Sequence, residues 1–442
     1  MVKIKTATGP STTLKPTVLI VATDRWYPTA RLAIALAHAG CAVHAVCPAG
    51  HPLSKIRTVQ RLHDYNGLMP LMSLERAIAR TNPDLVIPAD DLATRHLHQL
   101  NVRERHRRGA GSPICELIQR SLGAAQSYDI LGARSASIQI AQEEGVHAPK
   151  TEVIADRVAL RNWIAHTGFP TVLKANGTSG GNGVRVVNSL EEAEQAFRKL
   201  QAPPLLARAV KHALVDRDLT LIRPSLTRRR STVNAQTFVA GREATSTLVC
   251  WEGAVLASLH FEVLEKAAAT GHATVVRLIE HQEMAAAADK IVRRLQLSGF
   301  HGLDFMLEEN TGAAHLIEIN PRTTQVGHLT LGPGRDLPAA LYAALTGKNV
   351  VPAPRVTESD TIALFPQEWK RDPASPFLFA GYHDVPWEEP ALINSCVGGG
   401  QKQSLRISGR PARQQSAMSS SGNATPVIEI QSRDWASGQD RL

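Results

Sequence analysis

The sequence has few aromatic residues and no long apolar run. Phe, Trp and Tyr make up only 5% of its 442 residues, which leaves little material for a surface on which nucleic-acid bases stack. No apolar stretch approaches the ~20 residues that a membrane-spanning helix needs. The opening stretch, MVKIKTATGPSTTLKP, carries charges without an apolar segment after them, so it lacks the pattern of a signal peptide. We therefore expect a cytoplasmic protein with no membrane partner.

Cysteines are few and scattered. The chain has five, an odd number, and none has the spacing of a metal site: Cys41, Cys47, Cys115, Cys250 and Cys396. This pattern predicts free thiols in a reducing compartment instead of a disulfide framework.

Acidic residues are outnumbered by basic ones, and the formal net charge is +9. The basic clusters are local, at 103–108 (RERHRR) and 228–230 (RRR), and neither is interleaved with aromatics. We attribute the charge to solubility and to attraction of anionic small molecules such as ATP. Nucleic-acid binding is the alternative explanation, and it predicts association that weakens steeply with salt.

The first part of the chain alternates strands with helices. Apolar runs predict strands at 17–22, 41–46 and 84–89, and amphipathic segments predict helices at 29–39, 71–80 and from 91 to near 100. This alternation predicts a small, doubly wound parallel sheet over residues 15–112. No GxGxxG motif follows the first strand, so the glycine-rich loop that binds the phosphates of a nicotinamide cofactor is missing there. Asp90 and Asp91 lie at the carboxyl edge of this sheet, either as helix caps or as substrate contacts.

A lysine and a glycine-rich loop form the next motif, FPTVLKANGTSGGNGVRVV at 169–187. Lys174 ends an apolar strand, where an ammonium group is costly unless it meets an anion. Gly180, Gly181 and Gly183 allow backbone amides to close over phosphates. The lysine precedes the glycines, so this is not a Walker loop, and a plain hairpin tip is the structural alternative.

Regular elements continue through the middle of the chain. Ser189 and Glu192 have the spacing of a capping box for a helix over 189–200. Further strands are expected at VNAQTFVAG, EATSTLVCW and GAVLASLHFEVL, with helices at 282–295 and 337–345. Gln236, Thr237, Phe238, Val239 and Glu243 lie on one of these strands and its turn.

The stretch GFHGLDFMLEENTGAAHLIEINPRTTQVGH, at 299–328, predicts a hairpin closed by the Asn310-Thr311-Gly312 turn. Centred on Thr311, the hairpin places Asp304 opposite Glu318, and like charges so placed destabilise a sheet unless a cation lies between them. Asn320 and Arg322 follow at the strand period of two, whereas Ile317 and Ile319 should point into the core. Two carboxylates, an amide oxygen and a guanidinium suit Mg²⁺ that bridges phosphate oxygens, although an ordinary solvated sheet face is the alternative.

The two ends of the chain differ from its middle in composition. Residues 1–14 and the Gly-, Ser-, Gln- and Arg-rich stretch 398–442 are expected to be disordered. Residues 351–397 keep aromatics and prolines, so they are expected to form a small ordered appendage.

Three motifs in this order resemble the ATP-grasp superfamily, which includes D-alanine:D-alanine ligase, biotin carboxylase and carbamoyl phosphate synthetase. They are the lysine before a glycine loop, the strand ending in FVAGRE, and the late hairpin with DFM and EINPR. The resemblance covers about 17–347. It implies an α/β and α+β architecture in which the small parallel-sheet domain precedes a two-lobed ATP-grasp domain at 113–350, with a lid lobe at about 150–208.

The resemblance also implies a role for each motif. ATP would lie between the lobes with its phosphates under Lys174 and the glycine loop, its adenine along residues 236–239 and its ribose at Glu243. Mg²⁺, or Mn²⁺ in its place, would be held by Asp304, Glu318 and Asn320. Arg322 would stabilise the reacting phosphoryl or carboxylate group.

Two positions depart from the family pattern. The usual phosphate-contacting lysine ahead of the lid is replaced by Arg134, whose planar fork grips oxygens differently. Biotin carboxylase has a glutamate shortly after the hairpin, where this chain has Gly327, so bicarbonate activation by that residue is not expected.

The leading hypothesis from the sequence is an ATP- and Mg²⁺-dependent ligase. It activates a carboxylate substrate as an acyl phosphate, which an amine attacks with release of ADP and phosphate. The alternative is a regulatory or scaffold protein that binds ATP without catalysis. The partners expected are small-molecule carboxylates and amines, and a homo-oligomer is left open. Candidate substrate contacts are Asp24, Arg25, Asp90, His328 and Arg335.

Overall fold

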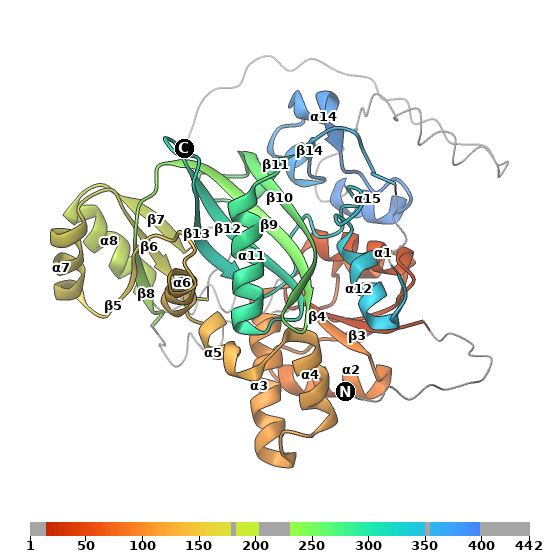
Figure 1. Cartoon of the computed structure of the whole chain (residues 1–442). Helices are drawn as coiled ribbons and strands as arrows, with labels where there is room; N and C mark the ends of the chain where they lie inside the picture. The colour runs from red at the N-terminus through yellow and green to blue at the C-terminus, as the bar shows by residue number, and fades with distance from the viewer. Residues whose placement is uncertain (1–14, 178–182, 203–229, 350–353, 398–442) are drawn as a thin grey trace, which may run out of the picture.

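Three β-sheets organise the chain in the computed structural model, which describes residues 15–177, 183–202, 230–349 and 354–397 (Figure 1). The predictions of disorder at 1–14 and 398–442 lie outside these residues, as do Gly180 and Gly181.

The N-terminal sheet is parallel with strand order β3-β2-β1-β4, as the alternating pattern predicts. Its strands and helices are β1 (Thr17–Val21), α1 (Tyr27–His38), β2 (Ala42–Cys47), η1 (Pro52–Lys55), β3 (Val59–Asp64), α2 (Pro70–Thr81), β4 (Leu85–Pro88) and α3 (Asp91–Arg108). The central strands are buried on both faces, so their residues are continuously apolar.

The structure differs from the predictions for this region at two places. Strand β3 is not predicted by the sequence, because it lies at the sheet edge and only His63 of its six residues is buried, which leaves little apolar pattern. Helix α3 continues to Arg108 instead of ending near Leu100. Its last turns are basic and mostly exposed, and basic side chains are favourable at a helix C-terminus. Gly109 ends it at φ +86°, a conformation that glycine adopts without strain.

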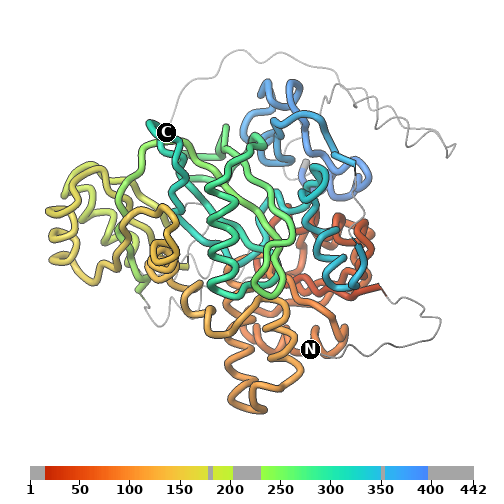
Figure 2. The backbone as a smooth tube through the Cα atoms, in the orientation of Figure 1, coloured from red at the N-terminus to blue at the C-terminus, as the bar shows by residue number. Residues whose placement is uncertain are grey.

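Helices α4 (Pro113–Leu122), α5 (Tyr128–Leu131) and α6 (Arg134–Glu143), with the short η2 (Ala125–Ser127), lead to the second sheet. This antiparallel sheet has the order β5-β8-β6-β7 and consists of β5 (Thr151–Ile154), β6 (Thr171–Ala175), β7 (Val184–Val187) and β8 (Val233–Thr237). It packs against α7 (Arg157–Thr167) and α8 (Leu190–Gln201) around Trp163 and Phe197. We call this unit the lid; it is yellow in Figure 2, at one side of the central sheet.

The central sheet has seven strands in the order β13-β12-β9-β10-β11-β14-β15. They are β9 (Gly241–Trp251), β10 (Ala254–Lys266), β11 (Ala273–Leu278), β12 (Gly299–Glu308), β13 (Ala314–Asn320), β14 (Thr361–Ala363) and β15 (Tyr382–His383). Helix α11 (Gln282–Leu295) covers one face through apolar residues at helical spacing, including Met284, Ile291 and Leu295. The opposite face packs toward α1 and α12 (Leu337–Thr346).

The predicted hairpin is present, but it contains an irregularity that the sequence did not indicate. Near the turn Phe305 pairs with Leu316, and one step further Asp304 pairs with Glu318, so Ile317 is an extra residue on β13. The bulge shifts the alternation of β13 by one residue. The prediction that Ile317 points into the core is therefore wrong: Leu316 and Ile319 are buried there, whereas Ile317 is only half-buried.

The C-terminal segment is ordered and is built into the central sheet. Strand β14 pairs antiparallel with β11, and β15 pairs parallel with β14. The remaining elements are α13 (Gln367–Arg371), α14 (Phe377–Ala380) and α15 (Pro390–Val397). Among the described residues no helix combines the length and apolar character that crossing a membrane requires.

Candidate active site

The two carboxylates of the hairpin lie on one rung of the sheet, as predicted. Asp304 on β12 pairs across the ladder with Glu318 on β13. The neighbouring strand β9 places Thr245 beside Asp304, and its hydroxyl donates to Asp304 Oδ1 at 2.9 Å. Asn320 Nδ2 donates to Asp304 Oδ2 at 2.8 Å. The side chain of Asp304 is thus fixed from both flanking strands.

The electrostatics of this rung favour a cation. Burial, with the charge of Glu318 beside it, raises the pKa of Asp304 from 3.8 to about 6. Both carboxylates and the amide of Asn320 are hard oxygen donors of the kind that Mg²⁺ prefers. The residues present therefore fit such an ion, although within the described ranges no three His, Cys, Asp or Glu side chains cluster in a way that would hold a metal alone.

Lys174 reaches this rung from the lid. Its Nζ donates to the carbonyl oxygen of Ile317 at 3.2 Å. This oxygen can accept the bond because the bulge removes Ile317 from the β-ladder. Burial lowers the pKa of Lys174 to about 8, and Arg134 acts in the same direction while Glu318 opposes it. Gln236 Nε2 lies 3.5 Å from the same carbonyl oxygen. The bulge therefore joins the lid to the hairpin.

Arg134 lies at the start of α6, where it forms an ion pair with Glu318, Nη1 to Oε2, at 2.5 Å. The structure thus places Arg134 against Glu318, whose charge also acts on Lys174. Two cations and two carboxylates meet in one small region, which is the arrangement expected around a phosphate chain and its metal.

Arg322 follows the hairpin, and its guanidinium is held on three sides. Its Nε donates to Asp91 Oδ1 at 3.0 Å, its Nη1 to the Thr323 carbonyl at 3.2 Å, and its Nη2 to Asn320 Oδ1 at 3.2 Å. The guanidinium carbon also lies 5.9 Å from the centre of the Trp26 ring. These contacts fix the plane of the guanidinium before any ligand binds.

The residues predicted to contact the nucleotide lie in two groups. Gly183 closes the β6–β7 hairpin, since its carbonyl accepts from Ala175 N at 2.9 Å. Thr237 ends β8, and Phe238 and Val239 follow it, with Phe238 exposed. Glu243 on β9 accepts from Lys266 Nζ at 2.6 Å.

Several predicted substrate contacts have structural partners. Asp90 caps α3 by accepting from Ala93 N and also holds Thr23 through its amide and hydroxyl, so the capping interpretation is correct. His328 Nε2 lies 2.7 Å from Asp384 Oδ2 in a buried contact. Arg335 pairs with Glu280.

Three residues at the site were not predicted for their roles: Thr245, Asp91 and Trp26. Thr245 touches Asp304 because β9 lies next to β12, and strand order cannot be read from local patterns. The position of Asp91 in the sequence indicates only a helix cap or a substrate contact. The side-chain hydroxyl of Thr94 on α3 also donates to the Pro321 carbonyl at 3.0 Å, so the N-terminal sheet domain packs directly against the segment that carries Arg322.

Comparison with solved structures identifies the fold. An N5-carboxyaminoimidazole ribonucleotide synthetase bound to ADP matches with a TM-score of 0.54 and 15% identity, covering 76% of this chain and 78% of that one. The Aspergillus clavatus carboxyaminoimidazole ribonucleotide synthase bound to ATP matches with a TM-score of 0.55 and 14% identity, covering 76% of this chain and 78% of that one. A third match is the biotin carboxylase domain of Hydrogenobacter thermophilus 2-oxoglutarate carboxylase, bound to MgADP, ADP and bicarbonate. Its TM-score is 0.53 and its identity 12%, covering 76% of this chain and 71% of that one.

The family comparison agrees with the fold. Residues 133–331 match the family described as carbamoyl-phosphate synthase L chain, ATP binding domain. Residues 133–331 are therefore similar to that ATP-binding domain, and the chain shares the fold of the solved enzymes. The matched segment starts just before Arg134 and ends after the Arg322 loop, so it contains every residue predicted to bind ATP, the metal or the reacting group, but not the candidate substrate contacts Asp24, Arg25, Asp90 and Arg335. No curated protein sequence matches the chain.

Proposed function

We propose that this protein is an ATP- and Mg²⁺-dependent ligase that activates a carboxylate as an acyl phosphate. The observation that supports this most directly is the paired rung of Asp304 and Glu318, with Lys174, Arg134 and Arg322 directed at it from three separate elements. A protein that only binds ATP has no evident need for two opposed carboxylates in a partly buried site.

Each residue has a proposed part in this reaction. Asp304, Glu318 and Asn320 would hold Mg²⁺, which when bound neutralises phosphate charge and orients the terminal phosphate. Lys174 and Arg134 would neutralise the phosphate oxygens from the lid side. Residues 236–239 and Glu243 would hold the adenosine, and Gly180, Gly181 and Gly183 would cover the phosphates.

Arg322 is the proposed catalytic residue at the reacting end. Its fixed guanidinium would bind the carboxylate as one of its oxygens attacks the terminal phosphate, so that ADP leaves and the acyl phosphate forms. An amine would then attack the acyl carbon, form the carbon–nitrogen bond and release phosphate. Because Asp91, Asn320 and Thr323 hold Arg322 in place, little reorganisation is required at that step.

The test is a mass-spectrometric search for ATP-dependent conjugates. The protein is incubated with ATP, Mg²⁺ and a metabolite extract, and products are compared with those of the Glu318→Gln variant. We expect a new amide-linked product and stoichiometric ADP with the parent protein only. Nucleotide affinity without turnover across a broad panel of carboxylates and amines would instead support the alternative, a regulatory or scaffold protein that binds ATP.

A further inference from the structure

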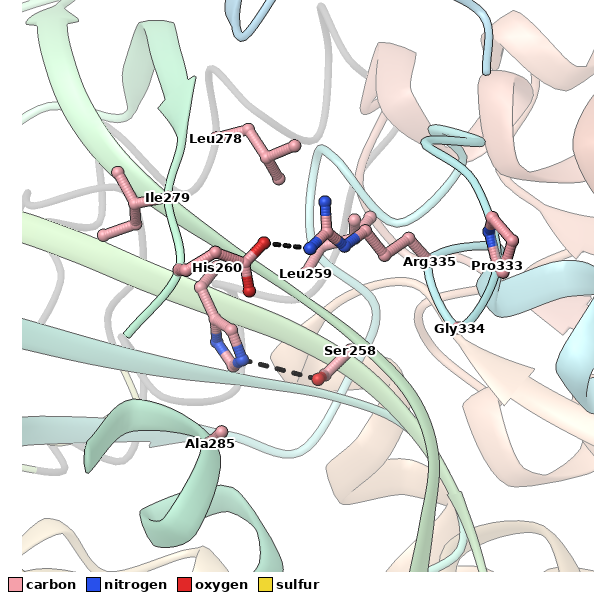
Figure 3. A pocket seen from close by; sticks show the side chains of 10 residues that line it. Ser258, Leu259, His260, Leu278, Ile279, Ala285, Pro333, Gly334 and Arg335 are labelled. Atoms are coloured by element: carbon pink, nitrogen blue, oxygen red, sulfur yellow. Dashed lines mark hydrogen bonds and ion pairs between the residues drawn. The ribbon is translucent and has the colours of Figure 1, made fainter. Parts of the chain in front are cut away.

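A separate cavity of about 240 Å³ opens beside β10 (Figure 3). It is lined by residues 258–260 of β10, the end of β11, the start of α11 and the loop at 333–335. It exists because β11 stops short: its last residue, Leu278, lies opposite Phe261, so the edge of β10 continues beyond it. Beyond Leu278 the backbone of β10 makes isolated hydrogen bonds in place of a continuous ladder. Ile279 N donates to His260 O at 2.9 Å, and Ser258 N donates to Gly334 O at 3.4 Å.

The polar groups of the cavity are few and complementary. His260 is only 7% exposed; its Nδ1 lies 2.7 Å from Ser246 Oγ and its Nε2 3.4 Å from Ser258 Oγ. Burial lowers the pKa of His260 to about 4, so the ring is neutral near pH 7. Figure 3 shows Arg335 pointing across the cavity, where it pairs with Glu280. The lining thus holds one cation, one anion and a neutral histidine among apolar side chains.

The volume restricts the class of ligand. At ~30 Å³ for each water, the cavity has room for about eight water molecules. Pockets for drug-sized ligands start at roughly 300 Å³, so this cavity suits a molecule of amino-acid size better than a nucleotide.

The charges restrict the class further. The Arg335 and Glu280 side chains are 32% and 76% exposed, and such exposed ion pairs contribute little to stability. A ligand can therefore separate them at small cost. A simple anion would leave Glu280 without its partner, and a simple cation would do the same to Arg335. A molecule with both charges restores an opposite charge to each.

We propose that this cavity binds a small zwitterion, an α-amino acid or close analogue, with its carboxylate on Arg335 and its ammonium on Glu280, and that it regulates the ATP site. The regulatory part rests on the proposed function, whereas the binding does not. His260 is bonded to Ser246, and the next residue along β9, Thr245, donates to Asp304. Neighbouring side chains on a strand point to opposite faces, so the cavity and Asp304 lie on opposite faces of β9 and the ligand is not the substrate.

Isothermal titration calorimetry of the full chain without nucleotide tests the binding. Each common amino acid is titrated into the parent protein and three variants. Arg335→Gln removes the cation of the cavity, and Ala285→Leu fills the cavity. The control, Arg294→Gln, alters an ion pair elsewhere on α11. We expect saturable binding of at least one amino acid, weakened about tenfold or more by the first two changes and unchanged in the control. Circular dichroism confirms that the variants are folded.

Matched ligands test the zwitterion itself. The des-amino carboxylate and the decarboxylated amine of the bound amino acid should each bind about tenfold more weakly or worse. No saturable binding across the panel, or unchanged binding by Arg335→Gln, overturns the proposal. Equal binding of the des-amino carboxylate shows a plain anion site and refutes the zwitterion. Because calorimetry without ATP does not require turnover, these outcomes are independent of whether the protein is a ligase.

The regulatory part is tested by the affinity for Mn²⁺ with ATP, measured with and without a saturating amount of the bound amino acid. We expect a shift in the apparent dissociation constant that is absent in Ala285→Leu. An unchanged constant in the parent protein would overturn the coupling through β9.

Discussion

At the scale of single residues, Asp304 determines how the proposed metal site responds to pH. Its folded pKa of about 6 lies above its ordinary value of 3.8 because it is buried beside Glu318. In the metal-free protein it therefore keeps its proton to a higher pH than in the unfolded chain. Its contribution to stability is greatest below pH 3.8 and is lost as the pH rises through about 6.

Mn²⁺ affinity should rise over the same range, because a cation must displace the proton that Asp304 holds. We expect tighter binding at about pH 7 than at about pH 5, measured by electron paramagnetic resonance of free Mn²⁺. Asp304→Asn should bind Mn²⁺ weakly at both values. An affinity that is independent of pH in the parent protein would contradict this assignment.

Glu318 should be required for turnover and not for folding. Glu318→Gln keeps the shape of the side chain but removes one of the two anionic ligands and the partner of Arg134. We expect ADP release with an activating substrate to fall by about 10²-fold or more, with an unchanged melting curve. Turnover at the parent rate would remove the proposed mechanism.

At the scale of elements, the hairpin shows what the sequence can and cannot predict. Alternation on both sides of a turn predicted that Asp304 faces Glu318, which is correct. The bulge at Ile317 was not predictable, because Leu316 and Ile317 are equally apolar and local pattern does not say which is the extra residue. That bulge is what supplies the carbonyl to Lys174.

Strand order was also beyond the sequence. Thr245 contacts Asp304 because β9 lies between β12 and β10, and the neighbours of a strand are determined by packing over the whole sheet. Strand β3 was missed for a local reason, since its edge position leaves most of its side chains exposed.

The contact between β9 and β12 is close at one glycine. A Cβ at Gly241 would lie 2.0 Å from the carbonyl oxygen of Leu307, which is backbone and cannot turn away. We expect Gly241→Ala to lower the free energy of unfolding by about 2–3 kcal/mol in urea titrations. The matched control is Gly111→Ala, where the nearest atom is the side-chain Glu116 Oε1 at 4.0 Å. Equal stability of the two variants would show that the strands can separate without cost.

At the scale of the whole molecule, a buried ionic cluster joins both ends of the described chain. Asp384 beside β15 accepts from Arg31 of α1 and pairs with His328 of the loop after the hairpin. Arg31 and Asp384 are 353 positions apart, so no sequence pattern could have paired them. Together with the pairing of β11 and β14, the cluster anchors the ordered C-terminal segment to the rest of the fold.

Asp384→Asn should destabilise the protein strongly, because it removes the buried counter-charge of Arg31 and leaves only the half-exposed Glu388 at 3.6 Å. We expect a loss of about 3–5 kcal/mol in the free energy of unfolding at neutral pH. Although burial acts in the opposite direction, Arg31 and His328 lower the pKa of Asp384 to about 2. The ionised carboxylate therefore stabilises the fold fully at a pH above 3.8, its ordinary pKa. This contribution is lost as the pH falls through about 2. Acid titration of both proteins by circular dichroism measures this, and a variant as stable as the parent would contradict it.

The central claim is that Asp304 and Glu318 together hold the divalent cation that accompanies ATP. Mn²⁺ titration in the presence of ATP, followed by electron paramagnetic resonance, tests it directly in the parent protein, Glu318→Gln and the control Glu309→Gln at the exposed tip of the same hairpin. The account predicts one tightly bound Mn²⁺ in the parent and the control, and binding weakened about tenfold or more in Glu318→Gln. Equal Mn²⁺ affinity in all three proteins would contradict it.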